Sequence, residues 1–157
     1  MPVLYTWSGL VMKKVVIKLL TSGDASVLDR VAPEVFDNPV DSTLTREFLE
    51  DSRHHLAVAL DGETVVGMAS ALHYLHPDKP PELWINEVGV SPVYQNRGIG
   101  RELLRALFVH GKTLGCVEAW VGTERANSAA RRMYAAAGGE EDDRHLIISF
   151  DLLELAD

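Results

Sequence analysis

Residues 88–101 read VGVSPVYQNRGIGR, a stretch that changes from a strand pattern to a helical one. The valine-rich part that ends at Val90 favours a strand, and from Ile99 onward apolar residues recur at helical spacing. Between them, Gly98 and Gly100 let the backbone approach a ligand closely. A helix N-terminus offers unpaired N–H groups and the positive end of the helix dipole. The stretch therefore predicts a turn that binds an anion, and pyrophosphate is the natural ligand.

The rest of the chain alternates between strand and helix patterns. The Asp61-Gly62 pair is typical of a tight hairpin turn, and Gly138-Gly139 is expected to close a helix. Strands are expected at 15–20, 56–60, 64–75, 83–90, 117–121 and 146–152, and helices after 21–24, from Ser42 or Thr43, from Gly98 and at 127–137. This order predicts an α/β (α+β) fold with a mixed sheet and helices packed on it.

Bulk properties narrow the classes of protein. The 157 residues fit one domain, expected at 12–157, with 1–11 as an N-terminal extension or an upstream translation start. No stretch approaches the ~20 apolar residues of a membrane span, and the N-terminus lacks the pattern of a signal peptide. The net charge of -8 argues against a nucleic-acid partner and is compatible with a cationic small molecule. The lone Cys116 suits a reducing cytoplasm.

The anion turn has a specific spacing, in which Gln95, Gly98 and Gly100 follow the pattern Gln/Arg-x-x-Gly-x-Gly/Ala. Neither the P-loop pattern nor the Gly-x-Gly-x-x-Gly dinucleotide pattern is present. Taken alone, the two glycines would also fit a tight connection without a ligand. A second motif places Asn127 and Tyr134 seven residues apart, before a glycine. Together the two motifs resemble those of the GNAT superfamily of N-acetyltransferases, although Gly139 stands where many relatives carry Phe.

The resemblance implies a GNAT-like fold with a central six- to seven-stranded mixed sheet and about four helices. It also implies acetyl-CoA as cosubstrate, with pantetheine held by the backbone of a bulged strand that splays from its neighbour. No metal is expected, because the histidines show no metal-ligand spacing. The residues that the resemblance assigns to coenzyme binding are Val88, Val90, Gln95, Asn96, Arg97, Gly98, Ile99, Gly100, Arg101 and Asn127.

Two residues are candidates for proton transfer. The resemblance implies that Tyr134 is the general acid for the departing thiolate, although an amphipathic core position would also explain it. Glu87 takes the place of acidic residues found in several members and is the candidate base, because an amine attacks only when neutral. A solvated or salt-bridged strand residue is the alternative reading of Glu87.

The sequence defines the substrate that accepts the acetyl group less well than it defines the coenzyme. Val35-Phe36-Asp37 with Pro39, and Ile85 to Val90, resemble the aminoglycoside 3-N-acetyltransferases, which tend to carry acids where this chain has Asn127 and Ser128. The acids expected near the acceptor cleft are Glu34, Asp37, Asp41, Glu47, Asp78, Glu82, Asp142 and Asp143, or they form a solvated face. A polyamine, an amino acid or a protein amine would suit the same acids. A non-catalytic acyl-CoA sensor is a further possibility, and the family implies a homodimer, with 146–152 as a strand that pairs or packs at the interface.

Overall fold

The computed structural model describes residues 14–154, so the predicted extension at 1–11 lies outside the described residues. The described chain folds into one five-stranded sheet with the order β1-β2-β3-β4-β5. Strands β1 to β4 pair antiparallel in succession, and β5 pairs parallel to β4. The strands are β1 Val16–Leu19, β2 His54–Asp61, β3 Thr64–Tyr74, β4 Glu82–Val90 and β5 Ala119–Val121. The helices are η1 Ser22–Asp29, α1 Ser42–Glu50, η2 Pro92–Tyr94, α2 Ile99–Thr113 and α3 Ser128–Ala136, with η1 and η2 of the 3₁₀ type.

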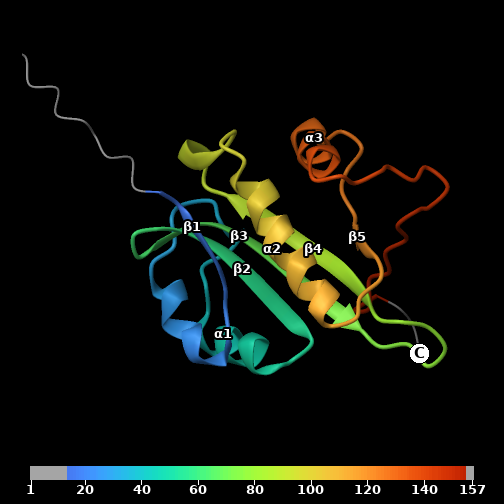
Figure 1. Ribbon diagram of the computed structural model, residues 1–157, viewed down its shortest axis with the longest axis horizontal. Coiled ribbons are helices and arrows are strands. Elements are labelled where there is room, and N and C mark those ends of the chain that lie inside the picture. The colour runs from blue at the N-terminus through green and yellow to red at the C-terminus, as the bar shows by residue number, and fades with distance from the viewer. Residues whose placement is uncertain (1–13, 155–157) are drawn as a thin grey trace, which may run out of the picture.

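The sheet separates two hydrophobic cores. Helix α2 crosses one face (Figure 1) and buries Leu103, Leu104 and Leu107 against the alanines of β2 and β3. On the other face, Leu28 of η1 and Leu49 of α1 belong to a second buried cluster. Because side chains alternate along a strand, β2 and β3 contribute one set of residues to each core. The predicted mixed sheet with helices packed on it is confirmed, and the helices lie on both of its faces.

Strand β4 contains a bulge. Its pairing with β3 joins Glu87 to Ser70 and Ile85 to Ala71, so Asn86 is an extra residue in the ladder. A bulge bends its strand and increases the local twist. Pairing between β4 and β5 stops at Ile85, opposite Val121. The second half of β4 therefore diverges from β5, as the resemblance implied.

Two expectations about secondary structure were wrong. The expected last strand, 146–152, is not part of the sheet, so the described sheet has five strands rather than six or seven. Its apolar residues are exposed, and the segment runs along the outer side of β5 (Figure 1). The helix expected after residues 21–24, where Leu28, Val31 and Val35 have helical spacing, is also shorter than this pattern indicates, because η1 ends at Asp29 and Val31 forms a β-bridge with Val65. That bridge requires an extended backbone, so contacts with β3 override the local helical pattern.

The turns that connect these elements follow the predicted chemistry. Gly62 has a φ of 61° in the hairpin between β2 and β3, and the side chain of Asn127 caps α3 by accepting the N–H of Ala130. Within residues 14–154, no helix combines the length and apolar character needed to cross a membrane.

Candidate active site

The turn between β4 and α2 has the backbone of an anion site. Asn96 and Gly98 both adopt the left-handed conformation, with φ values of 59° and 79°. The first α-helical hydrogen bond runs from the N–H of Glu102 to the carbonyl of Gly98, so the N–H groups of Ile99, Gly100 and Arg101 precede the helical ladder. Three N–H groups at a helix N-terminus, next to a left-handed turn, favour a bound phosphate.

The second glycine of this motif also serves helix packing. A Cβ on Gly100 would lie 2.3 Å from the Sδ atom of Met133, which belongs to α3. Gly100 is buried in the first turn of α2 and lets α3 approach closely. The close contact at Gly100 thus packs the anion turn against α3, the helix that carries Tyr134.

The side chains around the turn hold its shape. Gln95 donates from Nε2 to the carbonyl of Val90 at 3.0 Å, so it braces the turn against the end of β4. Tyr94 donates its hydroxyl hydrogen to Asp61 at 2.6 Å, and the guanidinium of Arg97 lies 5.2 Å from the centre of the Tyr94 ring. Arg101 extends back toward Gly98, where a Cβ would lie 3.7 Å from its Nη2. Two cationic side chains therefore border the anion turn.

In the second half of β4, residues 86–90, one edge of the backbone pairs with no described strand, and we call this segment the open half. The N–H of Ser91 donates to the carbonyl of Val66, which fixes the alternation of the antiparallel ladder with β3. By that alternation, Val88 and Val90 direct their N–H and C=O groups away from β3. No described strand pairs with them on that side, because β5 has already diverged. Their side chains pack into the core beneath α2, so only the backbone is available to a ligand.

Tyr134 reaches this region from α3. Its ring packs against the same core as Val88 and Val90, and its hydroxyl forms no hydrogen bond with another described residue. Burial raises the pKa of the Tyr134 hydroxyl above its usual value. At neutral pH the group therefore keeps its proton and can donate it.

Glu87 lies on the opposite face of β4. The bulge at Asn86 interrupts the alternation, so Val88 packs beneath α2 while Glu87 lines a pocket on the face of η1 and α1. The pocket has a volume of about 350 Å³ and is also lined by the loop 36–41. Burial raises the pKa of Glu87, and the Asp37 carboxylate raises it further. A carboxylate of this kind is better matched to proton transfer near neutral pH than a fully solvated one.

Four of the eight predicted acceptor acids are engaged in hydrogen bonds or ion pairs. Asp41 caps α1 by accepting the N–H groups of Thr43 and Leu44. Asp78 pairs with His76, Glu82 accepts the hydroxyl hydrogen of Tyr74, and Asp142 pairs with Arg144. Of the acids that line the pocket, Asp37 and Glu87 have no hydrogen bond or ion pair with another described residue. The structure thus brings three of the predicted acids into one cavity, and two of them, Asp37 and the candidate base Glu87, have no partner among the described residues.

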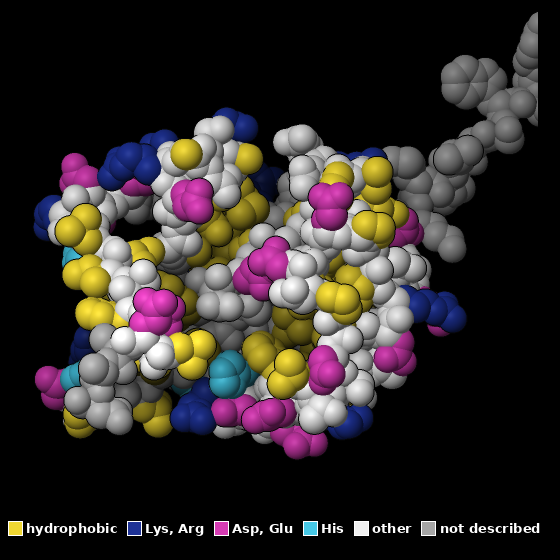
Figure 2. Space-filling model, turned by 180° about the vertical axis from the view of Figure 1, so that it is seen from behind, with side chains coloured by type: hydrophobic (Ala, Val, Ile, Leu, Met, Phe, Trp, Pro, Cys, Tyr) yellow, Lys and Arg dark blue, Asp and Glu magenta, His cyan; other side chains and the backbone are white. Residues whose placement is uncertain are grey.

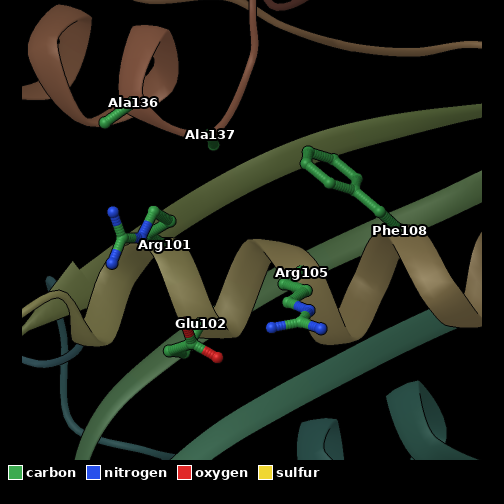
Figure 3. A pocket seen from close by; sticks show the side chains of 6 residues that line it. All are labelled: Arg101, Glu102, Arg105, Phe108, Ala136 and Ala137. Atoms are coloured by element: carbon green, nitrogen blue, oxygen red, sulfur yellow. The ribbon is translucent and has the colours of Figure 1, made fainter.

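A second hollow, of about 310 Å³, lies between α2 and α3. Arg101 and Arg105 line it from α2, together with Glu102 and Phe108, and Ala136 and Ala137 line it from α3 (Figure 3). It begins beside the anion turn, because Arg101 belongs to the first turn of α2. Arg105 therefore continues the positive charge beside the anion turn one helical turn further along α2. Within residues 14–154, no group of three or more His, Cys, Asp or Glu residues is arranged to hold a metal ion.

Comparison with known proteins identifies the family. Residues 26–138, which include both motifs, match the model of the acetyltransferase (GNAT) family. The chain belongs to this family. It is 35% identical over 128 residues to the N-alpha-acetyltransferase RimI of Mycobacterium tuberculosis, covering 79% of this chain and 77% of that protein. Members of this family are acetyl-CoA-dependent N-acetyltransferases, and this chain is accordingly an enzyme of that class.

More distant relatives act on antibiotics. An aminoglycoside N(6')-acetyltransferase of Salmonella typhimurium is 28% identical over 96 residues, which cover 57% of this chain and 66% of that protein. Among solved structures, an aminoglycoside acetyltransferase from an uncultured soil sample, in complex with sisomicin, superimposes with a TM-score of 0.69. It is 20% identical, covers 87% of this chain and 97% of its own, and so supports the fold alone.

Three details of the site were not foreseen. The resemblance implied a bulge in this strand but not its position at Asn86. That position has a signal in the sequence, because the apolar residues Leu83 and Ile85 are followed by Val88 and Val90, one position out of phase. The apolar lining of the pocket has no such signal, since it comes from separate segments. Gly89 was not singled out either, yet a Cβ there would lie 2.1 Å from the carbonyl oxygen of Val35.

Proposed function

We propose that this enzyme transfers the acetyl group of acetyl-CoA to a primary amine that enters the pocket beside Glu87. The observation that carries the proposal is the position of the open half of β4. The anion turn lies at one end of this segment. On one face of the segment lies the pocket in which the pKa of the Glu87 carboxylate is raised. Pyrophosphate would bind to the turn through backbone N–H groups, with Arg97 and Arg101 adding positive charge.

The backbone of β4 supports the orientation of the acetyl group. The open groups of Val88 and Val90 suit the amides of pantetheine, in the manner of an added strand. An N–H from this edge, aimed at the acetyl oxygen, would stabilise the negative charge that develops there. Asn127 would add its amide to the pantetheine arm while it caps α3. Substitution of the valine side chains should accordingly matter less than displacement of their backbone.

The transfer needs two proton movements. An alkylammonium, with a pKa of about 10.4, must lose a proton before its nitrogen can attack. Glu87 would accept this proton, directly or through a water, and pass it to solvent. The N–C bond forms as the C–S bond breaks, and the second amine proton is released from the product. Tyr134 would protonate the departing sulfur and regain its own proton, which leaves an amide and a free thiol.

Two acceptor classes follow from the relatives. A small cationic acceptor such as an aminoglycoside is supported by the free carboxylates of Asp37 and Glu87 and by the 6'-acetyltransferases. The alternative, a protein α-amine, is supported by the relative from M. tuberculosis. Polyamines and free amino acids stay open as acceptors. We also propose a cytoplasmic location, which the free Cys116 supports.

A thiol-release assay with acetyl-CoA tests the proposal. Release should depend on an added amine, and calorimetry should show that Gly98→Val abolishes acetyl-CoA binding because its φ of 79° excludes a branched residue. Gly62→Val, at the positive φ of the distant hairpin turn, is the matched control for strain. Binding of acetyl-CoA without turnover on any amine would instead identify a non-catalytic acyl-CoA sensor.

The proposal includes a homodimer. Leu146, Ile147, Ile148, Phe150, Leu152 and Leu153 are exposed in a segment that lies outside the sheet. Apolar patches of this kind are commonly covered by a partner, and a second copy would pack against this segment. Light scattering should give a dimer for the unmodified chain and a monomer for Ile148→Lys; a monomer in both cases would exclude the dimer.

A further inference from the structure

The lining of the acceptor pocket is predominantly apolar. Two aromatic rings contribute, Phe36 from the loop before α1 and Phe48 from α1 itself. Leucines complete the walls, with Leu28 from η1, Leu44 and Leu49 from α1, and Leu56 from β2. Figure 2 shows this side of the molecule, where hydrophobic side chains lie at the bottom of hollows and acidic side chains stand around them.

Few polar groups in the pocket are free to bind a ligand. The Asp41 carboxylate caps α1, and the hydroxyl of Thr45 donates to the Asp41 carbonyl at 2.8 Å. No lysine, arginine or histidine belongs to the lining. The free groups are neighbours: Ser70 of β3 is paired with Glu87 of β4, Asn86 precedes Glu87, and the Asp37 carboxylate is near enough to raise the Glu87 pKa, with Asn38 next to it in the loop. One end of the pocket is thus polar and acidic, while the walls toward α1 are apolar.

This distribution distinguishes between the acceptor classes. A polyhydroxylated aminosugar carries hydroxyl and amino groups all around its rings, and each one that enters an apolar wall without a partner loses its hydrogen bonds to water uncompensated. An amine joined to an aromatic or aliphatic body places its charge at the acidic end and its body against the phenylalanines and leucines. Such a body gains free energy of binding in proportion to the apolar surface that it buries.

We infer that the acceptor is a primary amine attached to an apolar body, with the amine held between Asp37 and Glu87 and the body against Phe36 and Phe48. This inference rests on the proposed acetyl transfer and narrows its acceptor. Asp37 is the specificity-determining residue for the charge. The Asp37 carboxylate lines the same cavity as Glu87 and offers the amine a second acidic partner during the approach. The shared chemistry fits a free arylalkylamine and the N-terminus of a peptide that begins with a bulky apolar residue.

A panel of matched acceptors tests the inference. The probes are 2-phenylethylamine, ethanolamine, kanamycin, spermidine and two dipeptide amides, Phe-Gly-NH₂ and Ser-Gly-NH₂. The value of kcat/KM should be at least tenfold higher for the apolar member of each matched pair than for the polar one, and higher than for kanamycin or spermidine. The arm that is faster, amine or dipeptide amide, distinguishes a free amine from a peptide N-terminus.

Two variants connect the preference to the pocket. Phe48→Ser should reduce the preference for phenyl acceptors to less than threefold, while calorimetry shows unchanged acetyl-CoA affinity. Asp37→Asn should raise KM for the amine about tenfold with kcat largely retained, whereas Asp78→Asn, at an acid outside the lining, should change neither. Thermal melts of each variant separate these effects from loss of fold.

The failures of the two proposals can be told apart. Turnover of kanamycin or spermidine above all apolar amines overturns the inference and leaves the acetyl transfer intact. An unchanged KM in Asp37→Asn removes Asp37 from acceptor recognition. Absence of turnover on every amine, with acetyl-CoA still bound, overturns both the inference and the proposed reaction.

Discussion

Strand β4 carries two glutamates whose surroundings are opposite. Glu82, in the first half, accepts a hydrogen bond from Tyr74 and pairs with Lys79 at 3.4 Å, and these partners lower its pKa. Glu87, in the second half, has no partner of this kind, and burial raises its pKa. The first half is paired with strands on both sides, while the second half is paired on one side alone. The same side chain on one strand is thus structural before the bulge and available for chemistry after it.

Substitution of the two glutamates should produce the largest contrast. Glu87→Gln removes the proton acceptor and should lower kcat by about 10²–10⁴-fold, without loss of acetyl-CoA affinity. Glu82→Gln keeps a hydrogen-bond acceptor for Tyr74 and should leave kcat within about threefold of the unmodified enzyme. Steady-state kinetics and calorimetry measure both variants. A comparable loss of kcat in the two variants would contradict the division of β4.

The open half of β4 is nevertheless tightly packed on one face. Because a Cβ on Gly89 would lie 2.1 Å from the Val35 oxygen, Gly89→Ala must displace the loop that leads into the acceptor pocket. We expect a loss of about 1–3 kcal/mol in the free energy of unfolding, together with a raised KM for the amine. Gly23→Ala is the control, since its Cβ would meet only Thr21 Oγ1, at 4.0 Å. If chemical denaturation gives the same free energy of unfolding for both variants, the loop moves without loss of stability.

The sequence predicted the paired half and the anion turn well, because both depend on local patterns. Valine-rich alternation, the two glycines that flank Ile99 and the Asn cap of α3 each lie within a few residues of the element they define. The acceptor pocket depends on η1, α1, the loop 36–41 and three strands, which meet only after folding, so its apolar walls could not be recognised in the sequence. The predicted strand 146–152 failed for a related reason. Its residue pattern is that of a strand, but a strand forms only where it can pair with the edge of another strand. The edge strand β5 is short, with three residues paired to β4.

Substitution of Tyr134 tests the proposed proton donor on the face of β4 that packs beneath α2. Tyr134→Phe retains the packed ring and removes the proton, so turnover should fall about tenfold, equivalent to about 1.4 kcal/mol in the barrier. Affinity for acetyl-CoA should change little. Tyr94→Phe serves as the control, because that hydroxyl bonds to Asp61 and holds the turn rather than a reacting atom. Unchanged turnover in Tyr134→Phe would remove the residue from the mechanism and leave it as part of the core.

The smallest expected effect concerns the stability of the sheet at His55 of β2. His55, which is 6% exposed, is hydrogen-bonded to His73 at 2.8 Å and to His110 at 3.1 Å, and His73 pairs with Leu83 of β4. Burial, followed by the charges of His110 and His73, lowers the pKa of His55 to about 4. The unfolded chain, in which this pKa is about 6.5, therefore binds more protons between pH 6.5 and 4. Stability from His55 is complete above pH 6.5 and is lost as the pH falls toward 4.

Thermal melts at pH 7 and pH 5 measure this loss. The unmodified chain should lose about 2–4 °C more between these pH values than His55→Gln, in which position 55 no longer titrates. The variant still carries the other histidines, so the difference isolates His55 from their titration. Equal slopes in the two chains would place the acid sensitivity elsewhere. Turnover should follow the titration of Glu87 instead and rise with pH through a pKa above that of an ordinary glutamate. The sheet would then show two separate pH dependences, one of stability from His55 on β2 and one of catalysis from Glu87 on β4.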